Sequence, residues 1–308
     1  MRTAIIGAGI SGLYLGQKLS QKGSEVVIYE QKEKITERVC SGLFSQRILD
    51  FIPESKNLIQ NKIDFCLIHF SKKTIQVNFS KSFFVMDHTE LDKLATGLAE
   101  KCGVKIIFNS NIISAPTGFD RVIGCDGANS AIRKSLGLQE PKMRLGIQGF
   151  VNEISSAEFV EVWPIKNGFI WKIPRKNDIE YGVIGDIAGC KKAFDEFLIK
   201  NDIVLQNVKS KIIPQGLILP KNNTTTLCGD SAGLTKPWSG GGVIWGLKAG
   251  NFLQETFPNF SAYRKKTRRF FLPKIIFSKI AIKIVYFLGF NIPWLLPKQA
   301  TIESDYLT

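Results

Sequence analysis

The stretch Thr3-Ala4-Ile5-Ile6-Gly7-Ala8-Gly9-Ile10-Ser11-Gly12 decides the fold, because its glycines follow an apolar strand and open a helical pattern. Gly7 supplies the tight turn, Gly9 lets backbone amides approach a pyrophosphate, and Gly12 allows close packing of helix on strand. The positive end of the helix, which includes Ser11, then faces the anion. The stretch therefore predicts the strand, turn and helix of a dinucleotide-binding fold.

An acidic residue follows at the spacing that this fold requires. The apolar run Glu25–Tyr29 predicts a second strand, and Glu30 comes directly after it, 18 residues beyond Gly12. A carboxylate in this place accepts hydrogen bonds from ribose hydroxyls. The complete order of strand, glycines, helix, strand and acid predicts nucleotide binding more firmly than the glycines alone.

Two further turn segments complete the pattern. Asp126-Gly127 ends a strand-like run in the middle of the chain. Near the other end, Gly229-Asp230 is followed by Pro237 and by Gly240-Gly241-Gly242-Val243. Ligands of open α/β sheets bind at the carboxyl ends of the strands. We therefore expect these segments and the first glycine stretch to form one flavin site.

The intervening sequence predicts a second, β-rich unit. The paired apolar runs 65–70 and 74–79, and later 168–173 and 179–184, are typical of hairpins. The expected fold class is α/β, a Rossmann-like FAD-binding domain with an inserted antiparallel β-rich substrate domain and a C-terminal helical tail. The expected boundaries are 1–62, 88–140 and 215–265 for the FAD-binding domain, 63–87 and 141–214 for the substrate domain, and 266–308 for the tail.

Cysteine usage limits the chemistry and the compartment. The six cysteines are scattered through the 308 residues, without a C-x-x-C pair or nearby histidines. Neither a metal site nor a disulfide framework is expected. The apolar N-terminal run belongs to the nucleotide fingerprint rather than to a secretion signal. We therefore expect a cytoplasmic protein with reduced thiols.

The tail carries half of the net charge of +14. From Phe260 onward there are nine Lys or Arg and two Asp or Glu, mixed with apolar runs such as 275–277 and 284–288. The charge-free stretch from 284 to 297 is too short to span a membrane. One interpretation is an interfacial helix in peripheral contact with an anionic membrane. The other is a helix that closes the protein's own core and turns its lysines outward. Nucleic acid is not an expected partner, because no nucleic-acid module is recognisable.

Several of these motifs resemble one family. The succession of the first glycine stretch, Asp126-Gly127 with Ser130 and Arg133, and Gly229-Asp230 with Pro237 resembles the FAD-dependent group of aromatic-ring hydroxylases and geranylgeranyl reductases over residues 1 to about 265. The stretch 167–175, Asn-Gly-Phe-Ile-Trp-Lys-Ile-Pro-Arg, and the stretch 39–43, Val-Cys-Ser-Gly-Leu, resemble motifs of the reductases. Two positions depart from the pattern: His88 stands where the group often places an arginine, and Ser41 replaces a glycine.

The resemblance implies roles for individual residues. Asp230 would bind the ribityl chain, Pro237 and the backbone of 240–243 would lie against the isoalloxazine, and Arg38 would approach the pyrophosphate. Ser41 and Gly42 would belong to the same site. Trp171, Phe169 and Trp238 are candidates for an apolar substrate channel, although aromatic residues in strands are also ordinary core.

The implied reaction is the saturation of isoprenoid double bonds in a lipid by hydride transfer with proton donation. Cys40 is the candidate proton donor, because a thiol in apolar surroundings stays protonated. The alternative is that Cys40 is only a small residue packed against the flavin. The electron donor, NAD(P)H or ferredoxin, stays open. Two other functions stay open as well, a monooxygenase of an aromatic or polyprenyl substrate and a non-catalytic lipid-binding protein stabilised by its flavin.

Overall fold

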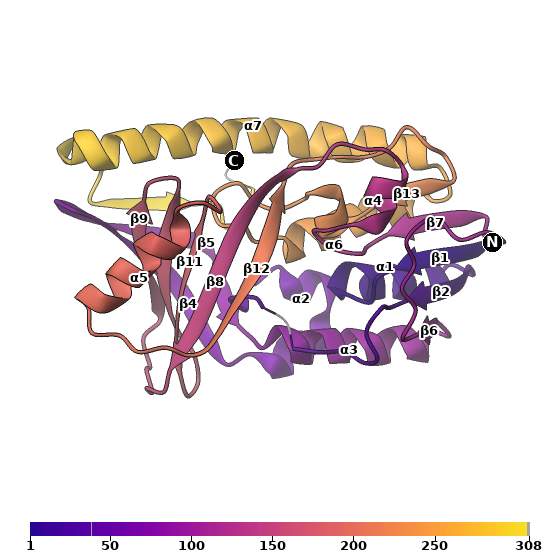
Figure 1. The fold of residues 1–308 in the computed structure, drawn as a ribbon, viewed down its shortest axis with the longest axis horizontal. Helices are drawn as coiled ribbons and strands as arrows, with labels where there is room; N and C mark the ends of the chain where they lie inside the picture. The colour runs from indigo at the N-terminus through magenta and orange to yellow at the C-terminus, as the bar shows by residue number, and fades with distance from the viewer. Residues whose placement is uncertain (38, 307–308) are drawn as a thin grey trace.

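The first glycine stretch lies at the centre of a five-stranded parallel sheet. A computed structural model describes residues 1–37 and 39–306. The strand order is β13-β7-β1-β2-β6, and every neighbouring pair is parallel. The bounds are β1 Arg2–Ile6, β2 Glu25–Tyr29, β6 Lys105–Ile107, β7 Arg121–Gly124 and β13 Thr225–Leu227. This order brings the ends of β1, β7 and β13 together, although they are far apart in the sequence (Figure 1).

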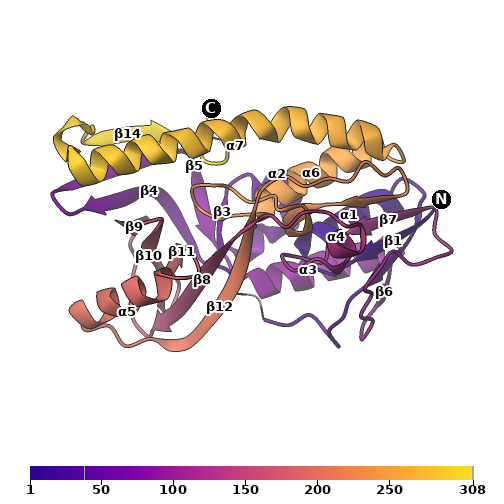
Figure 2. The ribbon, with the colours of Figure 1, turned by 45° about the horizontal axis from the view of Figure 1, so that its top comes forward.

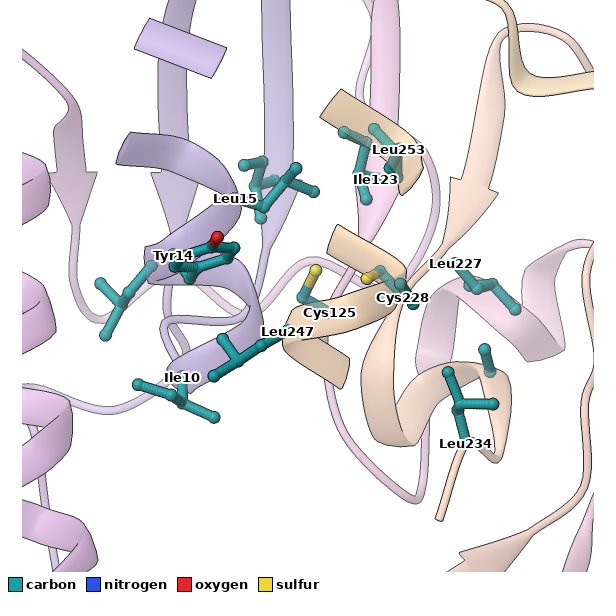
Figure 3. Close-up of a cluster of buried hydrophobic side chains, with 14 of the residues drawn as sticks. Ile10, Tyr14, Leu15, Ile123, Cys125, Leu227, Cys228, Leu234, Leu247 and Leu253 are labelled. Carbon is teal, nitrogen blue, oxygen red and sulfur yellow. The ribbon is translucent and has the colours of Figure 1, made fainter. Parts of the chain in front are cut away.

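Three helices pack beside this sheet and form the main core. Helix α1 (Ile10–Ser20) contacts both α3 (His88–Lys101) and α6 (Val243–Thr256). Figure 3 shows the apolar side chains between α1, the sheet and α6, with the sulfurs of Cys125 and Cys228 among them. Their burial removes apolar surface from water, which holds the glycine turn against the strand ends.

The second sheet is mixed and contains nine strands. Its order is β12-β8-β11-β10-β9-β4-β5-β14, with β3 paired to β5. Most pairs are antiparallel, but β4 with β9 and β14 with β5 are parallel. The bounds are β3 Leu43–Ser45, β4 Asn61–Phe70, β5 Lys73–Val85, β8 Lys142–Val151, β9 Phe159–Ile165, β10 Gly168–Pro174, β11 Ile179–Gly185, β12 Gln206–Gln215 and β14 Gln299–Ile302.

The shorter elements connect and cover the two sheets. Helix α5 (Cys190–Lys200) packs against the second sheet through Phe194. The remaining elements are α2 (Ile48–Phe51), α4 (Ala131–Ser135), η1 (Pro53–Leu58), η2 (Gly229–Ala232) and η3 (Pro293–Leu295). The first helical turn of α4 is capped by Ser130, whose Oγ accepts a hydrogen bond from the N–H of Arg133 at 2.9 Å.

The long helix α7 (Phe260–Asn291) runs along one edge of the molecule, over both sheets (Figure 2). One of its faces is buried through Tyr263, Thr267, Phe271, Ile275 and Gly289. A Cβ added to Gly289 would lie 2.0 Å from the ring of Phe70, so the helix approaches β4 closely at this point. Another face, in the second half of the helix, is exposed.

The expected fold class is confirmed, with two differences in detail. The inserted sheet is mixed rather than purely antiparallel. The tail is not only helical, because β14 follows η3 and pairs with β5 from Gln299–Gln76 to Ile302–Phe79. Among the described residues, no helix is sufficiently long and apolar to cross a membrane.

Candidate functional site

A cavity of about 540 Å³ lies where the parallel sheet faces the second sheet. The parallel sheet contributes the ends of β1, β7 and β13, and the second sheet contributes β8, β10, β11 and β12. Fourteen of the residues expected from the sequence line the cavity: Gly7, Gly9, Ser11, Glu30, Cys40, Ser41, Asp126, Gly127, Trp171, Asp230, Gly240, Gly241, Gly242 and Val243. Segments from the whole length of the chain therefore meet in one place.

The glycines of the first turn leave no room for side chains. Gly7 has φ +106°, and a Cβ on it would lie 2.4 Å from the carbonyl oxygen of Cys125. A Cβ on Gly12 would lie 2.1 Å from the carbonyl oxygen of Gly7. Gly12 therefore allows the helix to pack closely against the turn, and it does not line the cavity. The helix begins after Gly9 without a side-chain cap, which leaves its positive end toward the cavity.

Glu30 is buried and held by two backbone donors. Its Oε2 accepts a hydrogen bond from the N–H of Ala8 at 2.8 Å, and its Oε1 accepts one from the N–H of Lys32 at 3.1 Å. Each carboxylate oxygen has a second lone pair, and the residue lines the cavity. The side chain is thus fixed in a position from which it can accept ribose hydroxyls.

Both oxygens of the Asp126 carboxylate accept hydrogen bonds from other groups of the protein. Its Oδ1 accepts a hydrogen bond from Ser130 Oγ at 2.6 Å, and its Oδ2 accepts one from the N–H of Ile132 at 3.0 Å. Both bonds hold the start of α4. Buried Arg133 donates to the carbonyl oxygens of Ala128 and Ser231 at 2.6 and 2.8 Å. Arg133 therefore ties the Asp126 turn to the Asp230 turn.

The second glycine segment forms the opposite wall. Asp230 lies in η2, and its Oδ2 is 3.4 Å from Lys211 Nζ of β12. A Cβ on Gly242 would lie 2.7 Å from Asp230 Oδ1, so this glycine makes room for the carboxylate. Gly240 has φ +72°, and a Cβ there would lie 2.5 Å from Ile184. The wall consists of backbone that a flat ring could approach closely.

Ser41, the residue after Cys40, is joined to Trp171 by a buried polar network. Arg175 donates to the carbonyl oxygen of Ser41 at 2.6 Å and to Glu180 Oε2 from two of its nitrogens, at 2.5 and 2.9 Å. Trp171 Nε1 donates to Glu180 Oε1 at 2.9 Å. The stretch 167–175 is therefore bound to the stretch 39–43 directly through Arg175, and Glu180 links Arg175 to Trp171.

The indole ring of Trp171 occupies space that is left by a glycine on the neighbouring strand. It faces Gly182 across the β10–β11 pair, and a Cβ on Gly182 would lie 2.2 Å from the indole. The glycine thus allows the large ring to lie flat over β11. Because the indole N–H is bound to Glu180, the ring keeps one orientation at the cavity.

His88 lies beside Cys40 and changes its chemistry. The His88 ring lines the cavity together with Cys40, and its Nε2 lies 3.6 Å from Oδ1 of buried Asp92. Burial raises the pKa of Cys40, but the neighbouring His88, the N–H of Gly42 and the charge of Lys211 outweigh burial and bring the pKa below its ordinary value. The sequence-based expectation of apolar surroundings for Cys40 is therefore wrong.

The pKa of His88 moves in the opposite direction. Burial lowers it, whereas the neighbouring Cys40 and the Asp92 charge raise it, and the net pKa lies above the ordinary value. Lys211 works against this rise. The shifts favour the charged form of each group, a thiolate for Cys40 and an imidazolium for His88.

Some expected site residues lie outside the cavity lining. Gly42 has φ +63°, and a Cβ on it would lie 2.1 Å from the carbonyl oxygen of Met86, so Gly42 shapes the Cys40 loop. Pro237 is buried, with its carbonyl accepting from Gln215 at 3.3 Å. Phe169 contacts Trp171, and Trp238 packs edge-on against the core residue Trp245. Arg38 lies outside the described residues.

Several residues that line the cavity were not predicted as site residues. The sequence indicated His88 only as a replacement for an arginine and Asp92 only as part of a helix start, and it gave no signal for Gln148 or Lys211. Asp92 follows His88 by one helical turn, a spacing that can be read from the sequence. Gln148 and Lys211 lie on β8 and β12, and only the pairing of these strands brings them to the cavity.

The chain is similar to known proteins in its first segment and in its overall fold. Residues 5–49 match the family model of an NAD(P)-binding Rossmann-like domain. The chain is 24% identical to an uncharacterised protein of Methanocaldococcus jannaschii, over 87% of this chain and 79% of that protein.

Two solved structures show the same architecture. A geranylgeranyl bacteriochlorophyll reductase-like protein from Thermoplasma acidophilum superimposes with a TM-score of 0.78 at 17% identity, over 87% of this chain and 83% of the other. A mutant of the halogenase PltM, solved in complex with FAD, gives a TM-score of 0.73 at 15% identity, over 94% and 77%. At these identities the likeness concerns the fold.

Proposed function

We propose that the protein is a FAD-dependent reductase that saturates isoprenoid double bonds, of the geranylgeranyl type, in a lipid. The observation that carries this proposal is the meeting of the Cys40–His88 pair and Trp171 in the cavity that the glycine turns form. The similarity in fold to the reductase-like protein of T. acidophilum also supports a reductase.

The residues of the cavity fit FAD. The α1 N-terminus would hold the pyrophosphate, and Glu30 would hold the adenosine ribose. Asp230 would bind the ribityl chain, and the backbone of 240–243 would accept the ring, since a side chain at Gly240 would meet Ile184. When bound and reduced, FAD supplies a hydride to one carbon of the double bond.

The Cys40–His88 pair would supply the proton for the other carbon. An isolated alkene accepts a hydride poorly, so a positioned acid is needed. The proton would come from Cys40 Sγ or from the His88 ring, since the pKa of Cys40 is lowered and that of His88 is raised. Asp92 orients the imidazole and favours its charged form. The acid is thus a coupled pair rather than a lone thiol.

The second sheet would hold the lipid. Trp171, Ile184 and Ile213 line its side of the cavity and offer an apolar surface to a polyprenyl chain. The Arg175–Glu180 network fixes the Trp171 ring and leaves the carboxylate paired. The electron donor that we propose is NAD(P)H or ferredoxin.

A monooxygenase is the second candidate. Gln148 and Lys211 place polar groups beside Cys40, and such groups suit a substrate that carries oxygen. The same fold supports different flavin chemistries, because function lies in the site rather than in the fold.

Anaerobic reoxidation distinguishes these functions. The FAD-loaded protein is reduced with dithionite, mixed with a geranylgeranyl ether lipid, and followed by its visible absorbance. The reductase predicts reoxidation by the lipid, and a saturated lipid is the matched control. If the lipid does not reoxidise the flavin, but NAD(P)H is consumed in air and a hydroxylated product forms, the result would favour the monooxygenase. If neither a saturated nor a hydroxylated product forms, the result would indicate that the cofactor is structural.

A further inference from the structure

The second half of α7 and the turn after it expose a row of large apolar side chains. Ile280 is 53% exposed, Phe287 61% and Trp294 71%, values typical of surface polar residues rather than of a core. We call this surface the tail face, and it consists of Ile276, Phe277, Ile280, Ile284, Phe287, Trp294 and Leu295.

The exposed row is not the face that α7 uses for folding. Ile276, Ile280, Ile284 and Phe287 follow one another at helical spacing and therefore share one side of the helix. The buried side contains Phe271, Ile275 and Gly289, which pack against the rest of the protein. The second half of α7 is thus apolar on both sides, although the fold covers only one of them.

Positive charge lies along the same helix. Lys265 and Arg269 continue the exposed row toward the N-terminus of α7, while Lys279 and Lys283 lie beside its apolar part. From Phe260 to Ile302 the sequence contains no Asp or Glu. An apolar row that is flanked and extended by cations is the pattern of a helix that lies in the surface of an anionic membrane.

The position of α7 allows such contact. The helix follows the upper edge of the molecule in Figure 1 and stays at the edge when the molecule is turned in Figure 2. Its 32 residues form a rod of about 48 Å. Because no described helix can cross a membrane, a flat orientation is the one that buries the tail face.

We propose that the tail face docks the protein on an anionic lipid bilayer, with Ile280, Ile284 and Phe287 below the headgroups and Lys265 and Arg269 at the phosphates. Trp294 would lie at the boundary, where amphipathic rings are favoured. A second copy of the chain is a poorer occupant, because it would bring the same cations against each other. The proposal does not depend on which reaction takes place in the cavity, because it rests only on the residues of α7 and η3.

Vesicle flotation tests the proposal. The full-length, FAD-loaded protein is mixed with vesicles of phosphatidylcholine, alone or with phosphatidylglycerol, at low and high salt. We expect binding to the phosphatidylglycerol vesicles that weakens with salt and is much lower with phosphatidylcholine alone. Equal binding to both compositions, or none to either, would overturn the proposal.

Matched variants locate the contact. Ile280→Asn with Ile284→Asn removes apolar contact without changing charge, and we expect roughly tenfold or greater loss of vesicle binding. Ile199→Asn with Val204→Asn is the control, since these residues are 81% and 80% exposed elsewhere. Both proteins should keep the unfolding temperature and the flavin content. Equal effects of the two pairs would contradict docking through the tail face.

Sedimentation distinguishes the other occupant. A concentration-dependent dimer that is lost in the Ile280→Asn, Ile284→Asn protein, without vesicle binding by the parent, would show that a second copy covers the tail face. The proposal predicts the same sedimentation for the parent and both variants.

Discussion

His88 on α3 and Cys40 in the loop before β3 are neighbours that both line the cavity formed by the glycine turns. Their proximity lowers the pKa of Cys40 and raises that of His88, although burial acts against both shifts. The two side chains therefore form a polar and titratable corner of an otherwise glycine-rich cavity.

The first prediction concerns the pH dependence of Cys40 reactivity. Because the pKa of Cys40 is lowered, its thiolate forms at a lower pH than an ordinary thiol, and alkylation by iodoacetamide should begin at a correspondingly lower pH. His88→Asn removes the stabilising charge, so the alkylation profile should move to higher pH, with roughly tenfold slower reaction for each unit of pKa. Peptide mass spectrometry of the flavin-free protein measures the profile. Cys66, whose pKa burial raises to about 12, serves as the unreactive reference. Identical alkylation profiles of the parent and the His88→Asn variant would refute the claim that His88 lowers the pKa of Cys40.

The second prediction separates proton donation from packing. Cys40→Ala should keep FAD bound and slow lipid reduction by about 10²–10⁴-fold, the usual contribution of a general acid. Cys102→Ala is the control, because Cys102 caps the far end of α3 and does not line the cavity. Flavin absorbance after gel filtration and single-turnover rates measure the two effects. Unchanged turnover would remove Cys40 from the mechanism and leave it a packing role.

The third prediction concerns the glycine turn. Gly12→Ala places a methyl group 2.1 Å from the carbonyl oxygen of Gly7, so the turn must shift. We expect about 1–3 kcal/mol lower free energy of unfolding and weakened FAD binding. Gly97→Ala is a matched substitution in α3, where a Cβ meets nothing within 4 Å, and it should raise stability by about 0.5–1 kcal/mol. Urea unfolding and flavin titration measure both. A harmless Gly12→Ala would mean that the turn is not closely packed.

The fourth prediction concerns the buried pair that orients Trp171. Burial raises the pKa of Glu180 more than Arg175 and Trp171 lower it. Arg175→Met removes the paired cation and should cost about 3–5 kcal/mol at neutral pH. Without Arg175 the pKa of Glu180 rises further, so the folded state holds its proton to higher pH than the unfolded state does. Stability of this variant should therefore fall as pH rises above the ordinary range of a glutamate.

The control for this prediction is the double variant Arg175→Met with Glu180→Gln. It leaves no buried charge and should recover most of the loss and flatten the pH dependence. Chemical unfolding at several pH values measures the effect. A single variant as stable as its parent at every pH would show that the pair contributes nothing.

The sequence was informative where a single turn of backbone sets the geometry. The roles of Gly7 and Gly12 follow from local conformation, and the structure places Gly7, Glu30 and Asp230 around one cavity. Lys211 could not be found in this way, because only the β8–β12 pairing brings it to the site. The short strand β14 was missed for the same reason, since its four residues become a strand only beside β5.

Residue type alone also left aromatic residues and Cys40 ambiguous. Trp171 and Trp238 were both candidates for a channel, with Trp171 favoured because it lies inside the motif-like stretch. Gly182 makes room for Trp171 at the cavity, whereas Trp238 packs against Trp245. For Cys40, the chemistry depends on a neighbour from α3 that the local sequence does not show.

The mass of the lipid product tests the central claim most directly. The FAD-loaded protein is supplied with dithionite and a geranylgeranyl ether lipid without oxygen, and the lipid is analysed by mass spectrometry. The account predicts the gain of two hydrogen atoms for each reduced double bond, and a large loss of this product with Cys40→Ala. An unchanged lipid under these conditions, together with gain of an oxygen atom when air and NAD(P)H are supplied, would contradict it.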